Sequence, residues 1–279
     1  MYRIVSKRQL AENVNEYVIH APHVARHAHP GQFIILRVNE QGERIPLTIC
    51  DYDRAEGTVR ILVQTVGATT YELSLLSAGD SISDFVGPLG NPTELDGYDR
   101  IVLVGGGIGS AVIYPQAKHL SALGKKVDVI VGARNKDLIM YEDEFRACTK
   151  DVHIVTDDGS YGKQGFVTTA LKELIDQGEK IDVVLAVGPM PMMRAVAELT
   201  RGYGIKTVVS MNTIMVDGTG MCGGCRLTVG GKTVYACVDG PEFDGHEVDF
   251  ASAMERGRTY REVESEHYCR MKAKYTEDK

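Results

Sequence analysis

The sequence lacks the features that direct a chain into a membrane or onto nucleic acid. No apolar run reaches the about 18 residues that mark a candidate membrane-spanning helix. Residues 1–8 enter a strand-like pattern directly and contain no signal-peptide core. The 38 acidic side chains outnumber the 31 basic ones, and the net charge of −7 argues against nucleic acid as the main partner. We therefore expect a cytoplasmic protein without a membrane segment.

Cysteine is scarce, with six in 279 residues, and no internal repeat or low-complexity tract is visible. Cys50, Cys148 and Cys269 are scattered, and we interpret them as small core residues or bystanders. In a cytoplasmic protein, cysteines that lie close together indicate metal or redox chemistry rather than a disulfide framework. The other three cysteines form such a group.

These three cysteines fall in one glycine-rich segment. Cys222 and Cys225 are separated by two residues, Cys237 follows twelve residues later, and Asp217 precedes Cys222 by five. The intervening glycines allow the backbone to fold tightly around a small inorganic group and to direct its N–H groups inward. The four potential ligands fit an iron–sulfur cluster, but a structural zinc loop or a redox-active dithiol has similar spacing. Asp217 is followed by Gly218, and Asp-Gly is a common turn pair, so Asp217 could also be only a turn residue.

The length predicts two domains with room for a small third module. Residues 1–97 contain short β-branched strands separated by turns, which predicts an antiparallel sheet or β-barrel with one short helix at 70–76. Residues 98–210 alternate apolar strands with helical stretches, which predicts a doubly wound parallel sheet. We expect the strand at 206–210 to close that sheet.

The remainder of the chain differs in composition from both domains. Residues 211–245 are predicted to form a small cysteine module, in which a hairpin strand at 232–238 carries Cys237. Residues 246–279 are charged and mostly helical in composition. This last segment is interpreted either as a solvated tail or as a segment that docks a partner.

Three glycine-bearing loops directly follow predicted parallel strands, at 105–109, 157–162 and 188–192. In an open parallel sheet, ligands bind where the carboxyl ends of the strands emerge. The first loop also opens a helix, so backbone N–H groups and a helix N-terminus can face a phosphate. One glycine turn is weak evidence, but three loops on one edge predict a nucleotide site.

The first domain offers a second set of groups. Arg44 can bind a diphosphate as a bidentate donor, and Thr48, four residues on, carries a hydroxyl that can hydrogen-bond a flavin ring nitrogen. Residues 66–70 lead into the short helix, whose first N–H groups could hold the same diphosphate. Each feature alone is common in proteins without such a ligand.

The order of these motifs resembles the ferredoxin–NADP reductase superfamily over nearly the whole chain. The motifs are Arg…Pro-Leu-Thr at 44–48, Gly-Pro-Leu-Gly at 87–90, Gly-Gly-Gly-Ile-Gly at 105–109, Val-Gly-Pro-Met-Pro-Met at 187–192 and the cysteine loop that ends Ala-Cys-Val-Asp-Gly-Pro at 236–241. Within the superfamily, the chain is similar to the electron-transfer subunits of dihydroorotate dehydrogenase. It is more similar still to the small subunits of NADH-dependent reduced ferredoxin:NADP oxidoreductase, also described as sulfide dehydrogenase subunits.

The resemblance implies FAD in the first domain, NAD(H) in the second and a [2Fe–2S] cluster in the third. By position, the flavin would contact Arg44, Pro46, Leu47, Thr48, Gly67 and Thr70. The nicotinamide nucleotide would contact Gly106, Gly107, Gly109, Asp157, Asp158, Gly188 and Met190. The cluster would be held by Asp217, Cys222, Cys225 and Cys237.

The implied function is electron transfer by a flavin oxidoreductase subunit that is linked to NAD(P)H and ferredoxin. Its implied partner is a larger flavoprotein with FAD and [4Fe–4S] clusters, and the complex would couple NADH, NADPH and ferredoxin by electron bifurcation. We expect no catalytic side chain, because the cofactors carry the redox chemistry. The alternatives are a subunit of a dihydroorotate or sulfide dehydrogenase, and a non-catalytic nucleotide sensor with a structural zinc loop.

Three positions depart from the family pattern. Asp217 stands where the dihydroorotate branch has cysteine, which favours the small-subunit branch. The usual flavin arginine lies three residues before the hydroxyl, where this chain has Ile45, so Arg44 is one residue further away. The helix after the glycine turn reads Ala111-Val112 instead of Ala-Pro.

Overall fold

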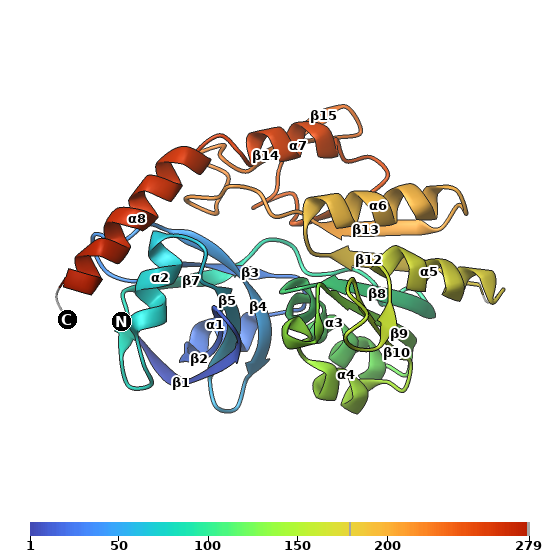
Figure 1. Cartoon of the computed structure of the whole chain (residues 1–279), viewed down its shortest axis with the longest axis horizontal. Helices are drawn as coiled ribbons and strands as arrows, with labels where there is room; N and C mark the ends of the chain where they lie inside the picture. Colours follow the sequence, from blue (N-terminus) through green and yellow to red (C-terminus); the bar gives the residue numbers. More distant parts are fainter. Residues whose placement is uncertain (179, 278–279) are drawn as a thin grey trace.

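The computed structural model describes residues 1–178 and 180–277 and contains two large sheets and one hairpin. Figure 1 shows the first sheet in blue at the left, the second in green and yellow at the right, and the C-terminal segments in orange and red above them. Among the described residues, no helix is both long and apolar enough to cross a membrane.

The first sheet is the predicted antiparallel barrel. Its strand order is β6-β1-β2-β5-β4-β3-β7, and the two edge strands β6 and β7 are separated in the chain only by Ser83, so the sheet curls until it is nearly closed. Alternate apolar side chains of these strands fill the interior. The elements are β1 (Tyr2–Ala11), β2 (Val14–His20), α1 (Pro22–His27), β3 (Phe33–Arg37), β4 (Ile45–Asp53), β5 (Thr58–Gln64), α2 (Ala68–Leu75), β6 (Ser81–Ile82) and β7 (Asp84–Leu89).

The second sheet has the order β11-β10-β9-β8-β12-β13-β16 and is parallel except for its last strand. Alternate residues of each strand face opposite layers of helices: α3 and α4 cover one face, α5 and α6 the other. This confirms the predicted parallel α/β domain. Its elements are β8 (Arg100–Gly106), α3 (Gly109–Ala122), β9 (Lys126–Ala133), η1 (Lys136–Leu138), α4 (Glu142–Cys148), β10 (Val152–Thr156), β11 (Lys163–Gln164), α5 (Val167–Asp176), β12 (Val183–Val187), α6 (Met190–Arg201), β13 (Lys206–Ser210) and β16 (Glu242–Asp244).

The prediction that strand 206–210 closes this sheet is wrong. β16, which follows the cysteine loop, pairs antiparallel with β13 through Val208–Asp244 and Ser210–Glu242. The chain therefore returns from the cysteine module to the nucleotide sheet, and the module is attached at both of its ends. The short motif Glu242–Asp244 has no apolar run that would reveal a strand.

The cysteine module contains one hairpin, β14 (Arg226–Val229) and β15 (Lys232–Tyr235). Cys237 lies beyond the end of β15, in a turn in which the Val238 and Asp239 N–H groups donate to the Tyr235 carbonyl at 3.1 and 2.8 Å. The prediction that the strand itself carries Cys237 is therefore wrong by two residues. The turn bends the chain, so that the thiol faces back toward the loop.

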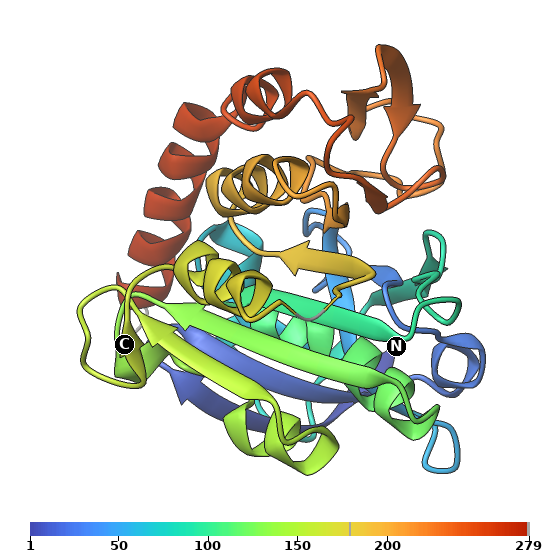
Figure 2. The same ribbon diagram turned by 90° about the vertical axis from the view of Figure 1, so that its right-hand side faces the viewer.

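The C-terminal segment is helical, as predicted, but it is not a simple solvated tail. In α7 (Phe250–Arg256), Phe250 and Ala253 are buried in the core that the module shares with α5 and α6. The last helix, α8 (Arg261–Glu277), then runs back to the barrel and packs against α2, as Figures 1 and 2 show. There the rings of Tyr71 and Tyr268 meet edge-on at 5.8 Å.

Candidate functional site

A cleft of about 1070 Å³ lies where the barrel meets the carboxyl ends of the parallel strands. The strand order reverses between β8 and β12, and a crevice at that point is the usual ligand site of such a sheet. The cleft is large enough for more than one cofactor ring. The predicted residues that line it are Pro46, Leu47, Thr48, Gly106, Gly107, Gly109, Asp157 and Gly188.

The glycine turn forms the wall of the cleft at the start of α3. A Cβ atom on Gly109 would lie 2.1 Å from the Val187 carbonyl oxygen, so only glycine lets α3 approach β12 this closely. Gly107 has φ +56°, which also favours glycine. The result is a helix N-terminus that opens on the cleft, with glycine at three of the four positions from 106 to 109. This arrangement fits a nucleotide diphosphate.

Five other predicted contact residues do not line the cleft. Gly67 and Thr70 form the cap of α2, where the Thr70 hydroxyl accepts from the Val66 and Gly67 N–H groups at 3.0 and 2.9 Å. Met190 is buried as the first residue of α6, while its neighbours Pro189 and Met192 face the cleft. The remaining two are Arg44 and Asp158.

Arg44 connects the barrel to the cysteine loop. Its Nε donates to the Val216 carbonyl at 3.0 Å, and its Nη2 donates to the Asp217 carbonyl at 3.4 Å. Its Nη1 lies 4.0 Å from the Asp84 carboxylate. The guanidinium group is thus bound by groups of the protein itself. Its contact with a flavin diphosphate stays a prediction.

Two acidic residues were predicted beside the nucleotide ribose, and they differ in position. Asp157 lines the cleft. Asp158 turns into its own loop, where hydrogen bonds from Ser160 lower the pKa of its carboxyl group. Arg134 lines the same cleft as Asp157, so a cation and an anion face the expected nucleotide together.

Sequence reasoning missed a third wall of the cleft, formed by Ser210, Met211, Asn212, Thr213 and Met215. These residues end β13 or directly follow it, so the rule that located the glycine loops would also have found this segment. The Thr213 hydroxyl is buried and has no hydrogen-bond partner among the described residues. Buried polar atoms normally have a partner, and at the wall of a cleft a water molecule or a bound ligand can supply it.

On the barrel side, the cleft also contains Phe33, Cys50, Leu62 and Gln64, which were not predicted. Cys50 follows Thr48 by two residues on β4, so both side chains face the same side of the strand. Its thiol is buried, and burial raises its pKa to about 12, so it stays a neutral, inert thiol. The period of two along the strand was the signal for this residue.

The four predicted cluster ligands are arranged as two pairs. The Cys225 and Cys237 sulfur atoms lie 3.3 Å apart and are buried. Burial, followed by the hydrogen bond with Cys225, raises the pKa of Cys237 to about 12. In the other pair, a hydrogen bond from the Cys222 thiol holds the pKa of Asp217 well below its usual range.

Backbone donors surround these side chains, as an iron–sulfur cluster requires. The Gly220 N–H donates to the Cys237 sulfur at 3.1 Å, and the Gly224 N–H donates to the Cys222 sulfur at 3.4 Å. One Asp217 oxygen accepts from the Met221 N–H at 3.0 Å and from the Thr219 hydroxyl at 2.8 Å, and the other is buried. That oxygen has a lone pair available for a metal.

No three His, Cys, Asp or Glu side chains of residues 1–178 and 180–277 are close enough together to hold a single metal ion. Two separate pairs suit a cluster with two irons better than a mononuclear zinc site, whose four ligands surround one atom. The residues present therefore fit an iron–sulfur cluster.

Comparison with known proteins agrees with this geometry. The iron-sulfur cluster binding domain of dihydroorotate dehydrogenase B matches residues 212–249, and the oxidoreductase NAD-binding domain matches residues 103–198. The dihydroorotate dehydrogenase B electron transfer subunit homolog of Thermotoga maritima is 49% identical over 267 residues, which cover 96% of this chain and 94% of the relative. The electron transfer subunit of Geobacillus thermodenitrificans is 37% identical over 254 residues, covering 88% of this chain and 96% of that one. The chain belongs to this family of electron-transfer subunits.

A solved structure extends the comparison. The NADH-dependent reduced ferredoxin-NADP oxidoreductase, studied for flavin-based electron bifurcation, contains a chain that is 47% identical to this subunit, with a TM-score of 0.92 and 97% of each chain covered. Phthalate dioxygenase reductase, at 17% identity and a TM-score of 0.57, shares the fold. The subunit has the ferredoxin-reductase-like fold, and its cofactors are FAD, NAD(H) and an iron–sulfur cluster.

Proposed function

We propose that this subunit exchanges a hydride between NAD(H) and FAD and passes single electrons between FAD and a [2Fe–2S] cluster. One observation carries the proposal. A single cleft is lined by the barrel motif Pro46-Leu47-Thr48, by the nucleotide glycine loops and by the segment that leads into the cysteine loop. The barrel, the nucleotide loops and the segment that leads into the cysteine loop therefore share one cleft.

The chemistry that the bound cofactors supply is hydride exchange at the flavin ring and one-electron exchange at the cluster. The protein's part is to bind and orient. The Thr48 hydroxyl and the Thr213 hydroxyl, which has no hydrogen-bond partner among the described residues, both belong to the cleft lining and are offered to the flavin ring. The N-terminus of α3 and the glycines 106, 107 and 109 are offered to the nucleotide diphosphate. Buried apolar walls, such as Phe33 and Met211, exclude water from the transfer.

We assign the cluster ligands to Asp217, Cys222, Cys225 and Cys237, with one iron at each pair. The Asp217 carboxylate, which pairs with Cys222 and has one buried oxygen, and the 3.3 Å contact of Cys225 with Cys237 support this assignment. The same loop receives two hydrogen bonds from Arg44, a residue of the flavin barrel. The contact between barrel and loop supports direct electron exchange between their cofactors.

We also propose that the subunit works with a larger catalytic partner, a flavoprotein with FAD and [4Fe–4S] clusters, in a complex that couples NADH, NADPH and ferredoxin by electron bifurcation. The solved relative at 47% identity is reported as such an oxidoreductase, and the aspartate at position 217 favours this assignment. A second candidate is electron delivery to a dihydroorotate dehydrogenase, because the relatives with 32–37% identity are subunits of that enzyme.

The visible spectrum and an anaerobic titration test the proposal. We expect purified protein to show flavin bands and a broad iron–sulfur absorbance, and NADH to bleach the flavin. A colourless protein that contains zinc would instead support a nucleotide sensor with a zinc loop. Pull-down of the partner from the native source, followed by its cofactor analysis, separates the bifurcating complex from a dihydroorotate dehydrogenase.

A further inference from the structure

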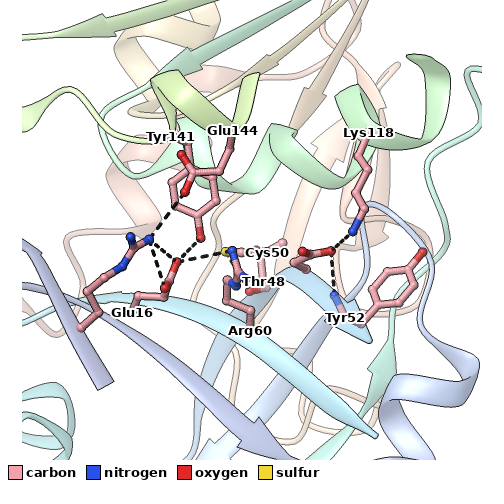
Figure 3. Close-up of polar contacts among 10 residues, drawn as sticks. Glu16, Thr48, Cys50, Tyr52, Arg60, Lys118, Tyr141 and Glu144 are labelled. Carbon is pink, nitrogen blue, oxygen red and sulfur yellow. Dashed lines mark hydrogen bonds and ion pairs between the residues drawn. The ribbon is translucent and has the colours of Figure 1, made fainter. Parts of the chain in front are cut away.

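A buried polar contact joins the barrel to the nucleotide domain beside the cleft. Figure 3 shows the Glu16 carboxylate of β2 at its centre, with Tyr141 reaching it from the nucleotide domain. The Tyr141 hydroxyl donates to Glu16 Oε2 at 2.7 Å. Only 6% of Glu16 and 4% of Tyr141 is exposed, so the bond is shielded from water. We call this pair the clasp.

Tyr141 is held in an uncommon backbone conformation to make this bond. Its φ is +64°, in the left-handed region that residues other than glycine seldom adopt. It caps the N-terminus of α4, and its ring meets that of Tyr114 edge-on at 5.4 Å. Local strain at a bulky residue persists only where the surroundings enforce it, and such residues cluster at functional sites.

The charge of Glu16 does not need the tyrosine. Arg8 and Arg60 lie 3.3 and 3.8 Å from its two oxygens, and Arg8 also pairs with Glu144 at 3.5 Å, so two positive charges balance two carboxylates. Burial raises the pKa of Tyr141 far above its usual value, so its hydroxyl stays a donor. The hydrogen bond of the clasp is therefore not needed to balance charge, and its contribution is to fix the position of Tyr141 relative to Glu16.

The clasp also lies at the edge of the cleft. Met140, the neighbour of Tyr141, lines the cleft from the nucleotide domain, and Cys50 lines it from the barrel. The two domains touch here through apolar side chains, which have no preferred direction, and through two ion pairs, Arg8 with Glu144 at 3.5 Å and Lys118 with Asp51 at 3.0 Å. The Arg8 and Lys118 side chains are more than half exposed, so water weakens these ion pairs, whereas both partners of the clasp are buried. A short hydrogen bond to a carboxylate does have a preferred direction.

We propose that the Glu16–Tyr141 clasp is a positioning contact that fixes the angle between barrel and nucleotide domain, and thereby the approach of the nicotinamide to the flavin. This inference rests on the proposed function. Hydride transfer requires the reacting atoms to be about 3–3.5 Å apart, and an error of about 1 Å can cost a hundredfold in rate. The clasp acts through geometry and touches neither cofactor.

The test compares two tyrosine variants in the complete, cofactor-loaded protein. Tyr141→Phe removes only the hydroxyl of the clasp. Tyr17→Phe is the matched control, because the Tyr17 hydroxyl is also buried but donates within the barrel, to the Leu73 carbonyl at 3.0 Å. Flavin reduction is followed by stopped-flow over a series of NADH concentrations, which separates the limiting rate from the nucleotide affinity.

For Tyr141→Phe we expect the limiting rate to fall about tenfold, because the reacting atoms would be displaced by less than the about 1 Å that costs a hundredfold. Nucleotide affinity, flavin content, iron content and melting temperature should match those of Tyr17→Phe. Glu16→Gln keeps an acceptor for the tyrosine and should retain more of the limiting rate than Glu16→Ala. Hydrogen exchange, measured without nucleotide, should increase at residues 141–148 in Tyr141→Phe but not in Tyr17→Phe.

The outcomes separate this inference from the function beneath it. If NADH does not reduce the flavin of the wild-type protein, the proposed function is overturned, and the inference with it. If NADH reduces the wild-type protein and Tyr141→Phe reacts at the same limiting rate, only the inference is overturned. If the rate of Tyr141→Phe falls only in proportion to its flavin content, the inference is also overturned, because the clasp would then serve flavin retention and not the approach of the nicotinamide.

Discussion

The cleft and the cysteine loop are built in opposite ways. The cleft collects its walls from residues between 14 and 241, contributed by both large sheets and by the segment after β13. The cysteine loop gathers its four ligand side chains from positions 217–237. The cleft is open space at a boundary between domains, whereas the loop is tightly folded and satisfies many of its polar atoms internally.

This difference determines how each region responds to change. Many weak contacts define the cleft, so the loss of one side chain leaves the others in place. In the proposed assignment, each of the four side chains of the loop supplies one ligand to the cluster, and no fifth ligand is assigned. We therefore expect all-or-none effects at the loop and graded effects at the cleft.

The largest effect is expected for Cys225→Ser. Cys225 is 1% exposed and pairs with Cys237, so its loss removes one thiolate from an iron in a site without a spare ligand. Iron and acid-labile sulfide should fall to a small fraction of the wild-type content, while flavin is retained. Cys269→Ser on the exposed face of α8 is the matched control and should keep the full iron content. Equal iron in both variants would contradict the assignment.

Asp217 gives the next largest effect and tests the variant position of the loop. Asp217→Cys should keep the cluster and lower its reduction potential, because a thiolate donates more electron density to iron than a carboxylate does. In a one-electron couple, a tenfold change in the equilibrium constant corresponds to a shift of about 60 mV. Asp217→Ala should make the cluster labile. EPR-monitored redox titration measures both. An unchanged g-tensor and potential in both variants would leave Asp217 as a turn residue.

Arg44 lies between the two regions, and its substitution distinguishes a role in flavin binding from a role in holding the cysteine loop. If it binds the flavin diphosphate, as the resemblance implies, Arg44→Ala should lose flavin affinity about ten- to a hundredfold and keep its iron. If its main role is the contact with the Val216 and Asp217 carbonyls, the same variant should lose iron first. The present geometry favours the second result. Flavin and iron contents of one preparation, with Arg44→Lys beside it, decide between them.

The sequence predicted the fold well wherever a pattern was local and continuous. The strands β8, after its first residue Arg100, and β12 are apolar and buried on both faces, so their assignment needed no tertiary information. β16 was missed because its three residues include Glu242 and Asp244 and become a strand only by pairing with β13. The end of β15 was misplaced because a turn carries Cys237 toward its partner thiol.

The site was predictable to the extent that its residues follow strand ends. Gly106, Gly109 and Gly188 were found by that rule, and Thr213 would have been found by applying it once more. The clasp could not be predicted, because Glu16 and Tyr141 are 125 residues apart and neither belongs to a motif. Only the packing of the two domains brings them together.

The smallest effect is expected at the nucleotide end of the cleft. Asp157 would accept from ribose hydroxyls and repel a 2′-phosphate, so the wild-type protein should show a higher kcat/KM with NADH than with NADPH. Asp157→Asn should lower the ratio of kcat/KM for NADH to that for NADPH by about tenfold. Arg134→Gln should raise this ratio, because Arg134 lines the same cleft and would attract the 2′-phosphate. Diaphorase assays with both nucleotides measure the ratio, and Asp176→Asn, on the outer end of α5, serves as the control for lost surface charge. A larger effect at Asp158 would mean that the ribose lies further along the loop. A wild-type preference for NADPH would contradict the assignment and leave Arg134 as the specificity-determining residue.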